Sequence, residues 1–278
     1  MYALISIGLT LIFGVSRISN FAQGEFVTLG MYATYWLNIS TGLDPYVAML
    51  IVIPIMFVVG LVIGVLVIRP ILFAPPVAQI FATVGLSLLI QNIALFLWGA
   101  DFRSIQTPLT GIVLRWGWLS FPLAQLIAFG VAMLVILLLH FFLKFTYLGK
   151  AMRAVAQDRP ASSLMSINVG LVDLLTFGLG TALAGIAGAL LMPLMPVYPT
   201  IGLNFVLIAF VVVVLGGLGS VMGALIGGLA IGMIETLTGF FAGSALRQMA
   251  YFVVFIVVLL VRPSGILGKR GAEAIGIK

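Results

Sequence analysis

Very few side chains in this sequence could carry out chemistry. Its 278 residues include seven acids, thirteen bases, one histidine and no cysteine. With His140 alone, neither a histidine-built nor a thiolate metal centre can form within one chain. No Ser-His-Asp or paired-carboxylate spacing is present either. The sequence therefore predicts no catalytic residue and no metal site.

A nucleotide site is not expected on this chain. The phosphate-binding motif Gly-x-x-x-x-Gly-Lys-Ser/Thr does not occur. Two Gly-Lys pairs, Gly149-Lys150 and Gly268-Lys269, lack the spacing of that motif and the hydroxyl that would coordinate Mg²⁺. We therefore predict that the chain holds no cofactor.

The remaining candidates are polar side chains inside apolar segments, namely Asn20, Gln23, Glu25, Gln91, Asn92 and Glu235. Such groups are costly in lipid, so they line pathways or bond neighbouring helices. Glu25 fits either a helix break that contacts substrate within a membrane or a turn at its cytoplasmic surface. The Gln91-Asn92 pair fits a pathway or a helix contact equally. Glu235 fits a gate that pairs with Arg247, or an interfacial residue in contact with water.

Composition identifies the environment of these side chains. Hydrophobic residues make up 63% of the chain and charged residues only 7%, against roughly 25% charged in a soluble domain. So few charges cannot cover a water-soluble fold, and the solvent must be lipid. The 32 glycines and 12 prolines indicate interrupted helices. Together these features predict an all-α polytopic membrane protein.

Charge-free runs define the elements that must position the candidates, because a helix needs about 20 apolar residues to cross a core of about 30 Å. The runs predict about eight or nine membrane-spanning helices in a single domain over residues 1–278. The candidate spans are 1–16, 26–43, 45–68, 76–99, 122–143, 172–195, 203–217, 221–240 and 247–261. Glycine stripes at Gly180-Ala184-Gly188 and Gly219-Gly223-Gly227 predict close helix packing.

Basic residues predict the orientation. Eight of the thirteen bases fall within residues 144–159 and 262–278. The positive-inside rule makes both segments cytoplasmic, and the second of them is the C-terminal tail 262–278. The same count places Arg69 inside and the loop 100–117 outside. Because these bases flank apolar spans, they indicate membrane orientation and exclude nucleic acid as a partner.

Residues 147–170 form the longest polar stretch and read as two short helices. Asp158 can cap the second, with Pro160 in its first turn. Leu164, Met165 and Ile167 give that helix an apolar face, and Asn168 with Gly170 can end it. A short amphipathic helix of this kind suits docking into a groove on a partner protein. An ordinary cytoplasmic loop is the alternative.

Several motifs then point to a family. They are Tyr2-Ala-Leu-Ile-Ser-Ile-Gly-Leu, Asn20-Phe-Ala-Gln-Gly-Glu25, Arg153-Ala-Val-Ala-Gln-Asp158, Ile167-Asn168, Leu215-Gly-Gly-Leu-Gly-Ser220, Gly223-Ala-Leu-Ile-Gly-Gly228 and Arg262-Pro-Ser-Gly-Ile-Leu267. Over essentially the whole chain they resemble the membrane permease of branched-chain amino acid ATP-binding-cassette importers, a family that also contains urea and short-chain amide permeases. The chain departs from the usual pattern at Gln23, where histidine is common, and at Gln157, where an acid is common.

The resemblance implies a permease bundle in the cell inner membrane that pairs with a second, homologous or identical permease. Two ATPase subunits would bind ATP and Mg, and an extracytoplasmic binding protein would deliver the solute. Residues 147–170 would be the segment that couples the permease to the ATPases, with Gly149, Arg153, Asp158 and Leu164 as its main residues.

Three alternatives stay open. The solute could be urea or a short amide, since a pathway with few fixed charges passes any small polar molecule. An ion-coupled secondary transporter would need several intramembrane carboxylates or histidines, and few are present. A membrane enzyme would need a catalytic constellation at one membrane face, and the sequence suggests none.

Overall fold

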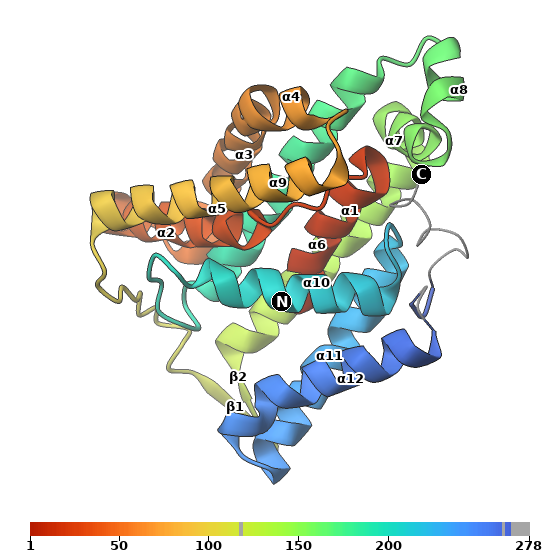
Figure 1. Ribbon diagram of the computed structural model, residues 1–278. Coiled ribbons are helices and arrows are strands. Elements are labelled where there is room, and N and C mark those ends of the chain that lie inside the picture. Colours follow the sequence, from red (N-terminus) through yellow and green to blue (C-terminus); the bar gives the residue numbers. More distant parts are fainter. Residues whose placement is uncertain (117–118, 263–264, 268–278) are drawn as a thin grey trace.

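The computed structural model describes residues 1–116, 119–262 and 265–267, and it is built almost entirely of helices (Figure 1). The first half contains α1 (Tyr2–Ser16), α2 (Gln23–Thr41), α3 (Pro45–Ile63), the π-helical turn η1 (Gly64–Ile68), α4 (Arg69–Ile71) and α5 (Pro76–Trp98). The second half contains α6 (Leu123–Phe145), α7 (Tyr147–Gln157), α8 (Arg159–Leu164), α9 (Val169–Leu191), α10 (Gly202–Gly216), α11 (Val221–Phe241), η2 (Ser244–Leu246) and α12 (Arg247–Val261).

Within the described part of the chain, five helices are long and apolar enough to cross a membrane, judged by length and composition. They are the continuous run Pro45–Ile71 and helices α5, α6, α9 and α11. Three more apolar helices, α1, α10 and α12, have 15 residues each. At 1.5 Å per residue, 15 residues cover only about 22 Å. The prediction of a helical polytopic membrane protein is confirmed, and it includes helices shorter than a full crossing.

Helix α2 differs from the apolar span predicted at 26–43. It begins at Gln23 and contains enough polar side chains to fall outside the membrane-spanning class. Its polar side chains are tolerated because the helix packs against protein on several sides, chiefly α9, α3 and α10. Two glycines allow the closest approach, since a Cβ on Gly24 would collide with the carbonyl of Gly202 and one on Gly30 with Gly185.

Helix α9 lies at the centre of the bundle, and α1, α2 and α3 cover it. The predicted glycine stripe on this helix is confirmed as a packing surface. Gly180 abuts Gly8 and Ile12 of α1, and Gly188 abuts the backbone of α2 at Val27. The stripe on α11 is confirmed too, because its glycines pack on the α10 backbone and on the end of α1.

A short β-hairpin lies in the loop between α5 and α6 and was not predicted. Strands β1 (Val113–Trp116) and β2 (Leu119–Pro122) pair antiparallel, with Val113 opposite Pro122. Each strand has only four residues, too few for an alternating pattern to stand out in so apolar a chain. A backbone bridge between Arg103 and Val197 ties this loop to the segment between α9 and α10.

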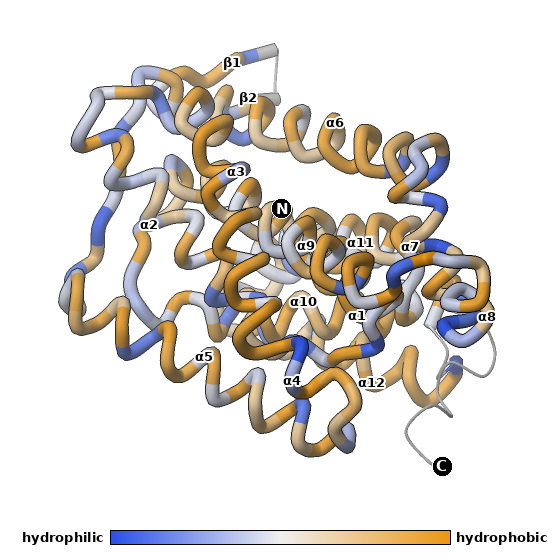
Figure 2. The backbone as a smooth tube through the Cα atoms, turned by 90° about the horizontal axis from the view of Figure 1, so that it is seen from above, coloured by the Kyte–Doolittle hydropathy of each residue, from blue (hydrophilic) through white to orange (hydrophobic). Residues whose placement is uncertain are grey.

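Arg262 and the described residues 265–267 lie at the same end of the bundle as the basic segment 144–159. Arg159 reaches the carbonyl of Val15 at the end of α1. The backbone N–H groups of Ile266 and Leu267 bond the last carbonyls of α10, and the α10–α11 turn packs on Gly14 of α1. Figure 2 shows hydrophilic segments at the α7–α8 edge and at the opposite, hairpin edge, with mainly apolar helices between them. Lys269, Arg270 and Lys278 lie outside the described residues.

Candidate functional site

Helix α7 is an amphipathic helix that lies against the bundle. Its apolar side chains Ala151, Met152 and Val155 are buried, and the helix contacts α6, α9 and α1. The Thr146 hydroxyl caps it by accepting a hydrogen bond from the N–H of Gly149, at 3.0 Å. Gly149 is itself buried and packs so closely on α6 that a Cβ at this position would collide with the α6 backbone. It therefore positions α7 and offers no surface to a partner.

Helix α8 begins as predicted and ends differently. The Asp158 carboxylate accepts from the N–H of Ala161 at 2.9 Å, which confirms the predicted cap. The prediction that Asn168 and Gly170 end this helix is wrong. The chain leaves α8 through Ser166, which has a positive φ of 60°. Asn168 instead caps the next helix, α9. Its side-chain oxygen Oδ1 accepts a hydrogen bond from the N–H of Leu171 at 3.0 Å.

The tip of α8 is an exposed apolar surface. Leu164 is 86% exposed and the adjacent Met165 is 78% exposed. Arg153 and Asp158 are also exposed. The Arg153 side chain turns back toward α6, where its Nη2 donates to the carbonyl of Lys144 at 3.4 Å. Of the four residues expected to couple the permease to an ATPase, three are therefore accessible and Gly149 is not.

A largely buried ion pair, with a buried carboxylate and a partly buried guanidinium, ties this segment to the bundle and was not predicted from the sequence. Asp173 on α9 is 3% exposed and forms a double contact with Arg159, with 2.5 Å between Nη2 and Oδ2 and 3.0 Å between Nη1 and Oδ1. The hydroxyl of Ser16 donates to the same carboxylate at 2.8 Å. The pair joins α8, α9 and α1. The available signal was Asp173 itself, an acid immediately before 61 uncharged residues.

Four of the six polar pathway candidates lie inside the bundle as two hydrogen-bonded pairs, Asn20 with Gln23 and Glu25 with Gln91. Asn20, Gln23, Glu25 and Gln91 are all buried. The Gln91 amide donates to Glu25 Oε1 at 2.7 Å, and the Gln23 amide donates to the carbonyl of Gly180 at 3.3 Å. Gly180 is near the middle of α9, so the break between α1 and α2 lies at that depth.

Glu25 is held by neutral donors only. Besides Gln91, the Ser87 hydroxyl donates to its Oε1 at 3.2 Å. Its second oxygen, Oε2, is buried and has no hydrogen-bond partner among the described residues. Gly202, the first residue of α10, lies so close that a Cβ there would be 2.7 Å from the carboxyl atoms. The side chain thus fills the junction of α2, α5 and α10.

The other two candidates lie elsewhere. Asn92 is exposed on α5, and its amide bonds its own helix at the carbonyl of Leu88, at 2.7 Å. Glu235 lines a cavity of about 540 Å³ near the end of α11, together with Arg247, Tyr2 and Tyr251. Of the two roles left open for Glu235, the ion pair with Arg247 is not formed: within the described ranges the structure contains just the Arg159–Asp173 pair. Arg247 instead lies over Gly239, whose missing side chain leaves room for it.

Comparisons with known proteins agree with this architecture. A family described as "Branched-chain amino acid transport system / permease component" matches residues 1–262. The high-affinity branched-chain amino acid transport system permease protein LivH of Escherichia coli K12 is 32% identical over 99% of this chain and 93% of that protein. The corresponding protein BraD of Pseudomonas aeruginosa is also 32% identical, over 99% of this chain and 94% of its own length.

The likeness extends to archaea. A probable branched-chain amino acid transport permease protein LivH of Methanocaldococcus jannaschii is 28% identical over 96% of this chain. No solved structure matches the chain significantly. The match over nearly the full length, on a polytopic helical bundle, leads to one conclusion: the chain belongs to the family of permease components of branched-chain amino acid transport systems.

Proposed function

We propose that this permease is one membrane subunit of an ATP-binding-cassette importer in the cell inner membrane, and that it translocates a branched-chain amino acid. The observation that supports this most is the α7–α8 segment, which ends in an exposed apolar tip and is anchored to the bundle by a buried ion pair. Such a tip fits a groove on a partner protein. The relatives supply the solute class, since their names describe branched-chain amino acid transport.

The proposed assembly contains two permeases, this chain and a second homologous or identical one. Two ATPase subunits bind ATP and Mg and dock on the α8 tips from the cytoplasm, where the C-terminus also lies. An extracytoplasmic binding protein delivers the solute to the opposite face. This chain holds no cofactor in the proposal; it converts movement of α8 into movement of the bundle.

The contacts suggest how that movement could reach the buried polar cluster. A displacement of α8 pulls on Asp173 through Arg159. Asp173 lies seven residues before Gly180 on α9, about 10 Å along the helix axis, and Gly180 binds Gln23 at the start of α2. A shift of α9 would therefore act on α2 and on Glu25, where three helices meet.

In this proposal Asn20, Gln23, Glu25 and Gln91 line the pathway once the helices separate, and Glu235 lines its outer part. A zwitterionic amino acid needs polar groups for its charged ends and apolar walls for its side chain, and the bundle supplies both. Asn92 is left out because its side chain is exposed on α5 and bonds its own helix. Urea or a short amide is the alternative solute, since either would meet the same polar groups.

The test is reconstitution of the chain in vesicles with its co-encoded ATPase and binding-protein subunits. Uptake of leucine, urea and a short amide is measured in parallel, with and without ATP. We expect ATP-dependent uptake with leucine preferred. Preference for urea or the amide would select the alternative solute. Uptake by this chain alone, driven by an ion gradient, would overturn the proposal.

A matched pair of variants sharpens this test. Leu164→Ser with Met165→Ser makes the α8 tip polar, and we expect ATP-dependent uptake to be lost while the protein remains inserted. Ile39→Ser is the control, because Ile39 is 59% exposed near the end of α2, away from the tip. Equal loss of uptake in both variants would count against docking at α8.

A further inference from the structure

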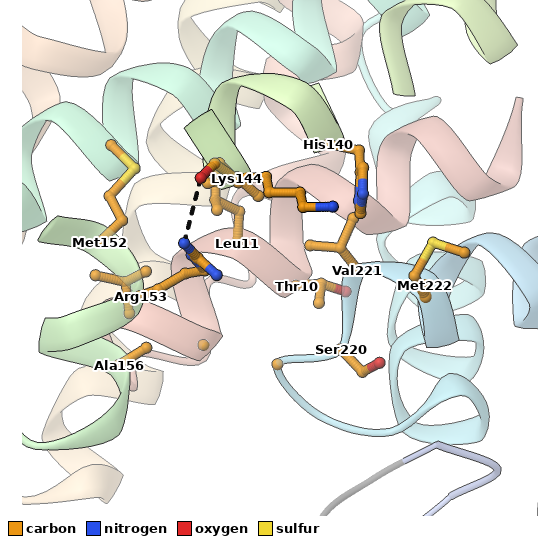
Figure 3. A pocket seen from close by; sticks show the side chains of 14 residues that line it. Thr10, Leu11, His140, Lys144, Met152, Arg153, Ala156, Ser220, Val221 and Met222 are labelled. Atoms are coloured by element: carbon orange, nitrogen blue, oxygen red, sulfur yellow. Dashed lines mark hydrogen bonds between the residues drawn. The ribbon is translucent and has the colours of Figure 1, made fainter. Parts of the chain in front are cut away.

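A second cavity lies at the end of the bundle where the basic residues gather (Figure 3). It measures about 390 Å³ and is enclosed by α1, α6, α7 and the turn that leads into α11. It is separate from the Glu25 cluster and from the α8 tip, and none of those side chains lines it. A ligand bound in this cavity would therefore be distinct from the transported solute.

Among the described residues, the charges that line this cavity are all of one sign. Lys144 and Arg153 line it together with His140, and its fourteen lining residues include no acid. The N-terminus of α11 also opens on it at Ser220 and Val221, and a helix N-terminus favours anions. Two bases with no carboxylate among the described lining residues leave a positively charged site.

Thr10 adds an unused hydrogen-bond donor. Its side chain is fully buried in α1, and its hydroxyl has no partner among the described residues. A helical threonine commonly bonds the carbonyl four residues before it, as Thr28, Thr34, Thr176 and Thr181 do in this protein. Thr10 does not. Figure 3 shows it in the wall of the cavity between Lys144 and Ser220.

We propose that this cavity binds a phosphate group, the chemistry shared by the headgroup of an anionic phospholipid and by inorganic phosphate. An ammonium, a guanidinium, a hydroxyl and a helix N-terminus form a donor set suited to phosphate oxygens. Basic pockets between membrane helices near the cytoplasmic side also suit lipid headgroups. The apolar part of the lining, Leu11, Leu143, Met152, Val221 and Met222, would accommodate the glycerol ester.

The apolar exposed faces of α6 and α11, two of the elements that bound the cavity, would offer a surface to acyl chains. Leu137, Leu138 and Phe141 of α6 are about half exposed, and so are Met222, Ile226 and Leu229 of α11. The geometry favours the lipid as the source of the phosphate, because a free ion would leave this apolar surface unused. The experiment therefore includes one arm for each source.

The purified chain in detergent is titrated with three additives: phosphatidylglycerol, a neutral glycolipid with the same acyl chains, and inorganic phosphate against chloride at matched ionic strength. The thermal unfolding midpoint is followed in each titration. We expect saturable stabilisation by phosphatidylglycerol and none by the glycolipid or chloride. Saturable stabilisation by phosphate alone would assign the site to the free ion, provided that Lys144→Gln and Thr10→Val abolish it.

Three variants make the test specific. Lys144→Gln removes one cavity charge, and Thr10→Val removes the unused hydroxyl with little change in shape. Each should raise the half-saturating concentration about tenfold or more, the effect of one lost hydrogen bond to a charged group. Lys150→Gln removes the same charge from α7 at an exposed position outside the cavity and should titrate like the wild type.

The proposal is overturned if none of the additives shifts the midpoint, or if the glycolipid stabilises as much as phosphatidylglycerol. It is also overturned if Lys150→Gln weakens binding as much as Lys144→Gln, because the effect would then be general surface charge. Should Lys144→Gln fail to fold, Thr10→Val alone decides, since it leaves every charge in place. The experiment involves no transport, so its result is independent of the proposed importer.

Discussion

Among the described residues, two carboxyl groups are almost completely buried, and they are held in opposite ways. Asp173 is 3% exposed and is clamped by the Arg159 guanidinium and the Ser16 hydroxyl. Glu25 is 1% exposed and meets only the neutral donors Ser87 and Gln91, with Oε2 free among the described residues. One carboxylate is paired with a cation, and the other is not.

The two carboxyl groups suit different roles. We call the Arg159–Asp173 contact the joint and the packing of α2, α5 and α10 around Glu25 the junction. Removing one partner of a buried ion pair leaves the other charge stranded, so the pair resists being pulled apart. Arg159 and Asp173 can therefore carry force between α8 and α9. Neutral hydrogen bonds are weaker and easier to exchange. Glu25 has such bonds and a spare acceptor, which suits a place where helices separate and re-form contacts.

The largest effect is expected at the joint. Arg159→Met removes the cation and should lower the free energy of unfolding by about 3–5 kcal/mol, because the buried Asp173 carboxylate keeps the Ser16 hydroxyl but loses its counter-charge. Chemical denaturation in detergent measures the loss. Arg159→Met with Asp173→Asn should recover most of the stability. A double variant as unstable as the sum of its parts would show that the pair does not act as a unit.

A smaller effect is expected from crowding the junction. Gly202→Ala places a methyl group against the carboxyl of Glu25 and should cost about 1–3 kcal/mol of unfolding free energy through overpacking. Gly232→Ala is the matched control, because a Cβ at Gly232 meets nothing within 4 Å. The same denaturation experiment compares them. If both substitutions were neutral, α10 would not pack as closely on Glu25 as the structure shows.

Ser16→Ala tests how much of the joint depends on the hydroxyl. The substitution removes one donor from Asp173 and leaves both Arg159 contacts in place. We expect a loss of about 1 kcal/mol, the typical net value of one hydrogen bond. Thermal unfolding midpoints are sufficient to detect it. A loss as large as that of Arg159→Met would make the hydroxyl, rather than the cation, the main partner of Asp173.

The smallest change in stability is expected for Glu25→Gln. The amide oxygen replaces Oε1 as acceptor for Gln91 and Ser87, and Oε2 has no bond to lose, so unfolding should change by less than about 1 kcal/mol. Reconstituted uptake should nevertheless fall, because the proposed pathway loses its carboxyl group. Wild-type uptake would remove Glu25 from the pathway, and a loss as large as at Arg159 would make it a second structural joint.

The sequence predicted features that depend on local signals. Asp158 caps a helix through a neighbour three residues away, and the spans follow from runs of apolar residues. Features that join distant parts of the chain left no such signal. Ser16 and Asp173 are 157 residues apart, and so are Gln23 and Gly180. Glu25 of α2 was recognised as a candidate, but its hydrogen bond with Gln91 required the fold.

The incorrect predictions have local physical causes. Asn168 can end one helix or begin the next, and the sequence does not distinguish these roles, whereas the structure shows its amide capping α9. The Glu235–Arg247 pair, one of two roles left open for Glu235, depended on how two helix ends meet. Both side chains line one cavity, but Arg247 is drawn over Gly239 instead.

The central claim is that the α8 tip is where an ATPase meets the permease. Because the chain has no cysteine, Leu164→Cys creates a single reactive site on the tip, and Phe102→Cys creates one on a 72% exposed residue in the loop between α5 and α6. A bifunctional thiol-to-amine crosslinker is applied to the assembled transporter in membranes. We predict that Cys at position 164 links to the ATPase subunit and Cys at position 102 does not. Linkage at position 102 alone, or equally at both, would contradict the account.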